Sequence, residues 1–231
     1  MKKVYWIILF LAVLVIECTG IQLSDQLLQD TCKPLLMPLL AASFLSQTKI
    51  NSTGFKAPVL AALFFSWTGD VLLMFQEKNS LFFLLGLSAF LLAHIFYIVF
   101  FHRARIRENV KSNLWFLLIV VIYYSVLISI LSPALNSPEF HKMKLPVRIY
   151  GIVISFMVML AMHMLFIKNR KAGRWMMLGA LLFVVSDSVL AINKFERSFE
   201  AAGLIIMLTY GLAQLFITEG AIRYIRSAHS N

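Results

Sequence analysis

The chain has 231 residues, of which 60% are hydrophobic and 14% are charged. A soluble domain averages about 45–50% apolar and about 25% charged residues, so this composition excludes a soluble or disordered protein. The net charge of +10 would suggest a nucleic-acid partner in a soluble protein, but here it is typical of basic loops on a membrane protein, and we expect no nucleic acid to bind.

Eight apolar runs follow one another along the chain. They are continuous rather than alternating, which excludes an antiparallel barrel, and a backbone in lipid must satisfy its own hydrogen bonds. The sequence therefore predicts an all-α, multi-pass transmembrane bundle of about eight helices, in a single domain over residues 1–231. The runs are Val4–Cys18, Pro34–Ser46, Ala57–Phe75, Leu81–Phe101, Leu114–Leu131, Pro146–Ile167, Trp175–Ile192 and Ala201–Ile222, of which the second is the shortest.

The first run has the form of a signal peptide, because Lys2 and Lys3 precede it. No small-x-small cleavage site follows its apolar core, which ends at Glu17 and Cys18, so we expect the first helix to be retained. Cys18 and Cys32 are predicted at neighbouring ends of the first two helices. Two unpaired thiols are the simpler interpretation, and a disulfide in an oxidising compartment is the alternative.

Basic residues are concentrated in alternate connections, with 14 on one side of the predicted membrane and 7 on the other. Cytoplasmic loops carry the excess of Lys and Arg, so both termini are predicted to be cytoplasmic. A bacterial inner membrane is the expected location, or the endoplasmic reticulum if the source is a eukaryote. The basic-rich set comprises Lys2, Lys3, Lys49, Lys56, Arg103, Arg105, Arg107, Lys111, Lys168, Arg170, Lys171, Arg174, Arg223 and Arg226.

An internal repeat relates the two halves of the sequence. An offset of 117 residues carries Asp70 onto Asp187. Each aspartate lies inside an apolar run, with a small residue directly before it and a Leu three residues after it. The same offset carries Gly86 onto Gly203 and Lys33 onto Tyr150. Two parallel four-helix repeats, over residues 1–111 and 112–231, would be related by an axis along the membrane normal. Such an axis would bring the two aspartates toward each other at one depth.

Asp70 and Asp187 are the main candidate functional residues. A charged group deep in a membrane helix costs roughly 2.5–3.5 kcal/mol on insertion scales, and such residues are usually functional. The alternative is a structural or snorkelling aspartate near the interface.

Further polar residues are predicted at or near the same level, which indicates a polar pocket. Each has a simpler interpretation, such as a snorkelling lysine, a tyrosine of the aromatic belt or a histidine bonded within the bundle. The candidates are Glu17, Lys33, Tyr150 and Asn193 near the ends of their helices, His94 and Tyr97 somewhat deeper, and Tyr210 and Gln214 on the last helix.

The chain has distinctive motifs at Thr31–Pro38, Gly69–Leu73 and Leu178–Ala191, and in these it resembles the YhhN family of membrane proteins. Thr31–Pro38 is similar to the Lys-Pro segment of that family, and Gly69–Leu73 to its first aspartate motif. The most distinctive stretch is Leu178–Ala191, which contains Ser186-Asp187-Ser188 and is followed by Phe195. The remaining matches are Gly86, Phe90, His94 and Tyr97 in the fourth helix and Thr209, Tyr210 and Gln214 in the last.

The resemblance implies an integral membrane hydrolase of about eight helices with no required cofactor. The family includes the animal lysoplasmalogenases, which hydrolyse the vinyl ether bond of lysoplasmalogens to a fatty aldehyde and glycerophosphoethanolamine or glycerophosphocholine. By motif, Asp70 and Asp187 are the implied catalytic pair. The expected substrate is a lysophospholipid that enters from the bilayer.

This chemistry suits a pair of carboxyl groups. Protonation of the β-carbon of a vinyl ether gives an oxocarbenium ion, which water then attacks. One carboxyl must be protonated and the other ionised, a division that a poorly hydrated site favours. By analogy with glycosidases, we expect the two groups to lie about 5–10 Å apart. We assign Asp187 as the acid, although the residues alone do not decide this, and Lys33 would bind the substrate phosphate.

Two other functions are compatible with the same residues. A proton-coupled transporter or lipid flippase would use carboxylates around a repeat axis, although these aspartates are predicted toward one side of the membrane. A metal-dependent membrane lipid hydrolase would need three ligands, which His94 and the aspartates could supply. No His-x-x-x-His spacing supports a metal site, and we expect no metal.

Overall fold

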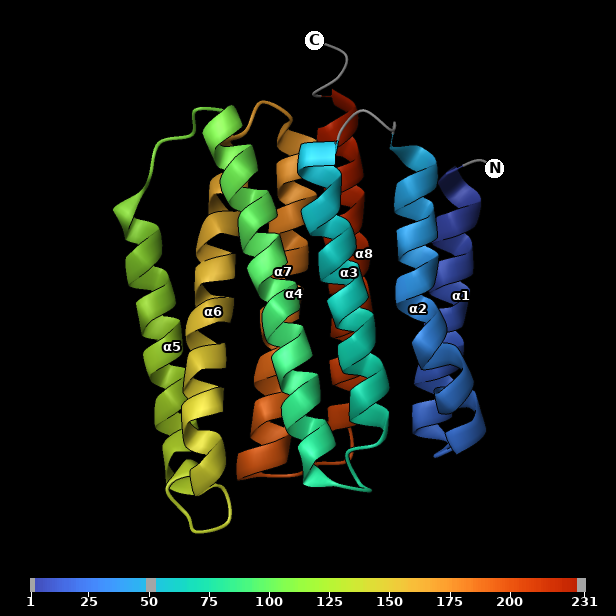
Figure 1. Cartoon of the computed structure of the whole chain (residues 1–231), viewed down its shortest axis with the longest axis vertical. Helices are drawn as coiled ribbons and strands as arrows, with labels where there is room; N and C mark the ends of the chain where they lie inside the picture. The colour runs from blue at the N-terminus through green and yellow to red at the C-terminus, as the bar shows by residue number, and fades with distance from the viewer. Residues whose placement is uncertain (1–2, 49–52, 228–231) are drawn as a thin grey trace.

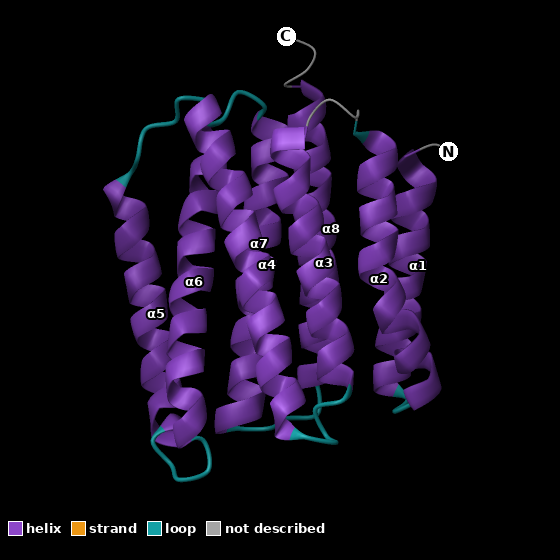
Figure 2. Ribbon diagram, in the orientation of Figure 1, coloured by secondary structure: helices purple, strands orange, loops and turns teal. Residues whose placement is uncertain are grey.

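A computed structural model describes residues 3–48 and 53–227 of the chain. Within these ranges the protein forms eight long α-helices and no strand (Figure 2), which confirms the predicted all-α fold. The helices are α1 (Lys3–Gln22), α2 (Gln26–Gln47), α3 (Thr53–Met74), α4 (Ser80–Arg107), α5 (Leu114–Leu135), α6 (Lys144–His163), α7 (Arg170–Ala191) and α8 (Ala202–Ser227).

The eight helices run side by side, alternately up and down (Figure 1). Helices α3, α4, α7 and α8 form the centre of the bundle, where α3 packs on α4 and α7 packs on α8. The pair α1 and α2 flanks this centre on one side, and the pair α5 and α6 flanks it on the other. The start of α1 and the end of α8 therefore lie at the same end of the molecule.

Seven helices in the described parts of the chain are long and apolar enough to cross a membrane. The outward face of α5 shows why, since Leu117, Leu118 and Ile122 each expose about half of their surface, as side chains facing lipid would. Helix α2 has similar length but is not among the seven. Its first turns carry Gln29, Asp30 and Lys33, which lower its hydropathy.

Helix α2 begins two turns earlier than the sequence predicted. The Asp25 side chain accepts hydrogen bonds from the backbone N–H groups of Leu27 and Leu28, at 3.0 and 3.2 Å, and so caps the helix at Gln26. The predicted start of this helix at Pro34, with Lys33 at its end, is therefore wrong. Pro34 lies inside the helix, and Lys33 is carried two turns into the bundle.

A second boundary also differs from its prediction, because α1 continues to Gln22. Glu17 consequently lies more than one turn before the end of α1 and is buried, rather than ending the helix. Cys18 and Cys32 are both free thiols, in agreement with the simpler of the two interpretations.

The orientation of the bundle in the membrane stays a prediction. The start of α1 and the end of α8 lie on one side, as eight helices that alternate in direction require. Lys2 and Lys49, which contribute to the predicted cytoplasmic excess, fall outside the described residues, as does the side chain of Lys3.

Candidate active site

A cavity of about 260 Å³ lies between α1, α2, α3, α4, α7 and α8, toward the end of the bundle where α1, α3 and α7 end. Six of the ten candidate residues line it, so the structure brings together side chains from positions 17 to 210. These six are Glu17, Lys33, Asp70, Asp187, Asn193 and Tyr210. The two aspartates therefore share one cavity, as the internal repeat led us to expect.

Asp70 lies near the end of α3 and is only 2% exposed. Its carboxylate accepts a hydrogen bond of 2.7 Å from the hydroxyl of Tyr210 on α8. The carboxyl group also interacts electrostatically with Lys33 and with Glu17. The ring of Phe90 packs edge-to-face against Tyr210, with centroids 5.7 Å apart, and holds that tyrosine in place.

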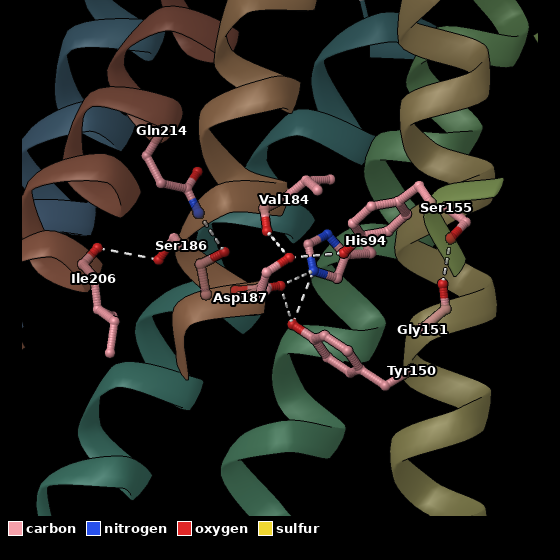
Figure 3. Close-up of polar contacts among 12 residues, drawn as sticks. His94, Tyr150, Gly151, Ser155, Val184, Ser186, Asp187, Ile206 and Gln214 are labelled. Carbon is pink, nitrogen blue, oxygen red and sulfur yellow. Dashed lines mark hydrogen bonds and ion pairs between the residues drawn. The ribbon is translucent and has the colours of Figure 1, made fainter. Parts of the chain in front are cut away.

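Asp187 is in a different environment, near the end of α7. Figure 3 shows His94 from α4 and Tyr150 from α6 converging on its carboxylate. The Tyr150 hydroxyl donates to Oδ2 at 2.5 Å, and Nε2 of His94 lies 3.0 Å from the same oxygen. The Asp187 side chain is 11% exposed and also lines the cavity. Its carboxylate is thus bonded on one side and open on the other.

The hydrogen bonds around His94 indicate its tautomer. The imidazole is fully buried, its Nε2 faces Asp187 and the Tyr150 hydroxyl, and its Nδ1 has no partner among the described residues. We therefore assign the proton to Nε2, where it has an acceptor. The ring packs against Phe183 at a centroid distance of 4.6 Å, which fixes its orientation.

Tyr97 and Gln214 meet behind the cavity rather than on its wall. The Tyr97 hydroxyl donates to Oε1 of Gln214 at 2.5 Å, and the Gln214 amide donates to Ser66 at 2.8 Å. All three side chains are buried. This arrangement joins α3, α4 and α8 one helical turn away from Asp70 and Tyr210, so the two predicted residues position the helices without lining the cavity.

Sequence reasoning missed two amide side chains of the cavity, Gln29 and Gln76. Both fall just outside the predicted apolar runs, because α2 was expected to start only at Pro34 and the third run to end at Phe75. The signal that could have placed Gln29 on a helix was Asp25, whose residue type favours the N-cap position.

The described part of the chain contains no group of three or more His, Cys, Asp or Glu side chains that could hold a metal ion. The cavity itself is lined by three carboxyl groups, one lysine and several hydroxyl and amide groups. Such a set suits proton transfer and recognition of a polar group next to an apolar wall.

The fold and the site together define a class of protein, a helical membrane bundle with a polar cavity at one end. Comparison with known proteins then places the chain, because the YhhN family matches residues 28–221. The chain belongs to the YhhN family.

Three relatives illustrate the similarity. The human lysoplasmalogenase TMEM86B is 30% identical over 204 residues, which cover 87% of this chain and 79% of that protein. The rat lysoplasmalogenase TMEM86B is 33% identical over 162 residues, or 70% of this chain and 60% of the relative. A lysoplasmalogenase from Mycobacterium tuberculosis is 29% identical over 205 residues, or 88% and 72%. No solved structure shows a significant match.

Proposed function

We propose that this protein is a membrane-embedded lysoplasmalogenase that cleaves the vinyl ether bond of a lysoplasmalogen. The observation that carries this proposal is the placement of Asp70 and Asp187 on one cavity in different environments. Membership of a family whose relatives bear the name lysoplasmalogenase supplies the reaction. The products would be a fatty aldehyde and a glycerophospho-alcohol.

The hydrogen bonds favour a division of roles opposite to the one expected from the sequence. Asp187 accepts from Tyr150 and from His94 on a single oxygen, and donors of this kind stabilise a charged carboxylate. Asp70 accepts from Tyr210 and is almost completely excluded from water. We therefore assign Asp70 as the acid and Asp187 as the base, in place of the reverse.

The proposed reaction has two stages, the addition of water to the vinyl ether and the collapse of the hemiacetal. Asp70 gives its proton to the β-carbon of the vinyl ether, and the oxocarbenium ion that forms is stabilised by the Asp187 carboxylate. Water adds to the α-carbon as Asp187 takes one of its protons, which gives a hemiacetal. The hemiacetal collapses as Asp187 returns that proton to the leaving alcohol oxygen and Asp70 takes the hydroxyl proton, so both residues regain their starting states.

The lipid would be held by its two ends. Lys33 lines the same cavity as the aspartates and provides a positive charge for the phosphate. The hydrocarbon chain would lie against apolar residues of the wall such as Ile206 and Met207, and would enter from the bilayer between helices.

The test is hydrolysis by purified protein in detergent, with Asp70→Asn and Asp187→Asn as variants. Each substitution keeps the shape of the side chain and removes its ability to transfer a proton, so activity should fall by about 10²-fold or more. Asp25→Asn is the matched control, because asparagine also caps a helix and residue 25 lies outside the cavity. Full activity in either cavity variant would remove that aspartate from the mechanism.

The same preparation separates this proposal from its alternatives. A transporter or flippase would accumulate the lipid across sealed vesicles without converting it. A metal-dependent hydrolase would lose its activity on treatment with a chelator, whereas the mechanism above uses only side chains and water.

A further inference from the structure

The cavity contains a third carboxyl group that the proposed mechanism does not use. Glu17 on α1 is 1% exposed, and its Oε2 has no hydrogen-bond partner among the described residues. Its carboxyl group faces the same cavity as Asp70 and interacts electrostatically with that residue and with Lys33. Glu17 is therefore a buried polar side chain with an unused acceptor at the edge of the proposed site.

An unpartnered carboxyl oxygen inside a membrane bundle is costly. Burial of a polar group without a hydrogen bond is unfavourable, and ionisable residues in membrane helices usually face a partner or a ligand. Residues 7–16 of α1 carry only apolar side chains, so nothing in the helix itself requires a glutamate at position 17. The cavity side of Glu17 is where its missing partner would lie.

Other residues of the cavity wall near Glu17 carry the complementary charge and further acceptors. Lys33 on α2 provides a cation, and one turn before it Gln29 donates its amide N–H to the Gly20 carbonyl at 3.2 Å. That bond leaves the Gln29 amide oxygen as an acceptor. Gln76, just beyond α3, also lines the cavity. A positive group and a negative group thus lie together where α1, α2 and α3 meet.

We propose that Glu17 and Lys33 form a subsite for a zwitterionic headgroup, in which Lys33 binds the phosphate and Glu17 binds a primary ammonium group. This inference rests on the proposed function and names the lipid class that the site prefers, an ethanolamine rather than a choline lysoplasmalogen. A primary ammonium has three N–H donors, which the Glu17 carboxylate and the amide oxygens can accept.

A quaternary ammonium fits these residues less well. It has no N–H to donate, and proteins usually hold it over the faces of aromatic rings. The aromatic rings on the cavity wall are Phe90 and Tyr210, which pack against each other, and the Tyr210 hydroxyl is bonded to Asp70. Both rings therefore belong to the reacting end of the cavity and leave Glu17 without an aromatic cage.

A simple counter-ion role for Glu17 predicts a different result. If Glu17 only neutralises Lys33, its removal changes phosphate binding, and the effect is equal for all headgroups. If Glu17 binds the ammonium, its removal changes the preference between headgroups. The ratio of kcat/KM for ethanolamine and choline lysoplasmalogens of the same chain length therefore separates the two.

The experiment compares full-length wild type with Glu17→Gln in detergent. The wild type should prefer the ethanolamine lipid, and Glu17→Gln should lose about 10-fold or more in kcat/KM for it, mainly through KM, because one charge-assisted contact is lost. The choline lipid should be affected much less. Glu77→Gln is the matched control, since Glu77 is exposed and does not line the cavity, and it should keep the wild-type ratio. An unchanged ratio in Glu17→Gln would overturn the inference.

A second variant and a second measurement cover the remaining cases. If Glu17→Gln does not fold, Glu17→Asp takes its place, because aspartate keeps the charge on a side chain that is one methylene shorter. This variant should reduce the preference for the ethanolamine lipid. An unchanged ratio of kcat/KM for the two lipids would also count against the subsite. Binding of glycerophosphoethanolamine and glycerophosphocholine, followed by calorimetry, needs no turnover. If wild type cleaves no vinyl ether lipid, the proposed function fails, whereas the subsite still predicts tighter binding of the ethanolamine compound that Glu17→Gln abolishes. Equal binding of both compounds by the wild type would contradict the subsite.

Discussion

Asp70 and Asp187 are identical side chains whose surroundings differ, and that difference underlies the proposed chemistry. Asp70 is bonded to Tyr210 and excluded from water, whereas Asp187 is bonded to two donors and remains open to the cavity. An acid and a base made from two aspartates require such an asymmetry. The separation of about 5–10 Å between the two carboxyl groups, expected by analogy with glycosidases, stays a prediction.

Removal of a donor to Asp187 tests this assignment. Tyr150→Phe deletes the hydroxyl that lies 2.5 Å from the carboxylate while it keeps the ring in place. Loss of one such donor should lower kcat by about 10-fold or more, with little effect on thermal stability. Tyr123→Phe is the control, because its hydroxyl bonds Ser188, the residue that follows Asp187, rather than the carboxylate itself, and Tyr123 does not line the cavity. Equal activity in the two variants would show that Tyr150 does not support the base.

The sequence located most of the polar residues of the cavity, because charged and amide groups are conspicuous in apolar helices. It could not distinguish Asn193, which lines the cavity, from Gln214, which bonds Tyr97 behind it. That distinction depends on the rotation of each helix about its own axis. Helix rotation is fixed by packing against neighbours, and periodicity in a helix that is apolar on all sides carries little information about it.

At the scale of elements, helix existence was predictable and helix boundaries were not. Long apolar runs determined all eight helices, but polar turns such as Gln26–Lys33 extend helices beyond those runs. After α7 the chain continues in a π-helical turn over Ile192–Glu196, which carries Asn193 onto the cavity wall. Turns of this type are frequent at functional sites, and no sequence pattern used above predicts one.

The contact between α7 and α8 depends on a glycine. A Cβ atom added at Gly179 would lie 2.7 Å from the backbone oxygen of Ala213 and 2.8 Å from the backbone nitrogen of Ile217. Gly179→Ala should therefore separate the two helices and destabilise the protein by about 1–3 kcal/mol. Thermal unfolding in detergent measures the change. Gly54→Ala is the control, since nothing lies within 4 Å of a Cβ at that position, and an equal Tm for the two variants would contradict the packing described.

At the scale of the whole molecule, we propose that the bundle consists of two parallel repeats related by an axis through its centre. The hydrogen bond between Tyr97 and Gln214 supports this, because the two residues are separated by 117 positions, the same offset that relates Asp70 to Asp187. A residue that contacts its own repeat equivalent lies beside the axis. The packing of α4 on α6 likewise corresponds to that of α8 on α2.

The repeats interlock, which leads to a prediction about the connection between them. Helix α8 packs on α1, α2 and α3, so each half of the chain completes the cavity of the whole. Cleavage at a protease site inserted between Lys111 and Ser112, in the exposed loop before α5, should leave the two fragments associated and most of the activity intact. Size-exclusion chromatography in detergent and the hydrolysis assay check this. Separation of the fragments would indicate that the halves do not hold each other in place.

The proposed mechanism requires that this chain cleaves a vinyl ether by carbon protonation between two aspartates. The most direct measurement is identification of the products formed by the purified protein from a lysoplasmalogen in ¹⁸O-labelled water. The expected products are a fatty aldehyde and an unlabelled glycerophospho-alcohol, because water attacks the alkenyl carbon and the alcohol keeps its own oxygen. Both products should form about 10²-fold or more slowly in the Asp70→Asn and Asp187→Asn variants. Absence of aldehyde from the wild type, label in the alcohol, or unchanged turnover in either variant would contradict the proposed mechanism.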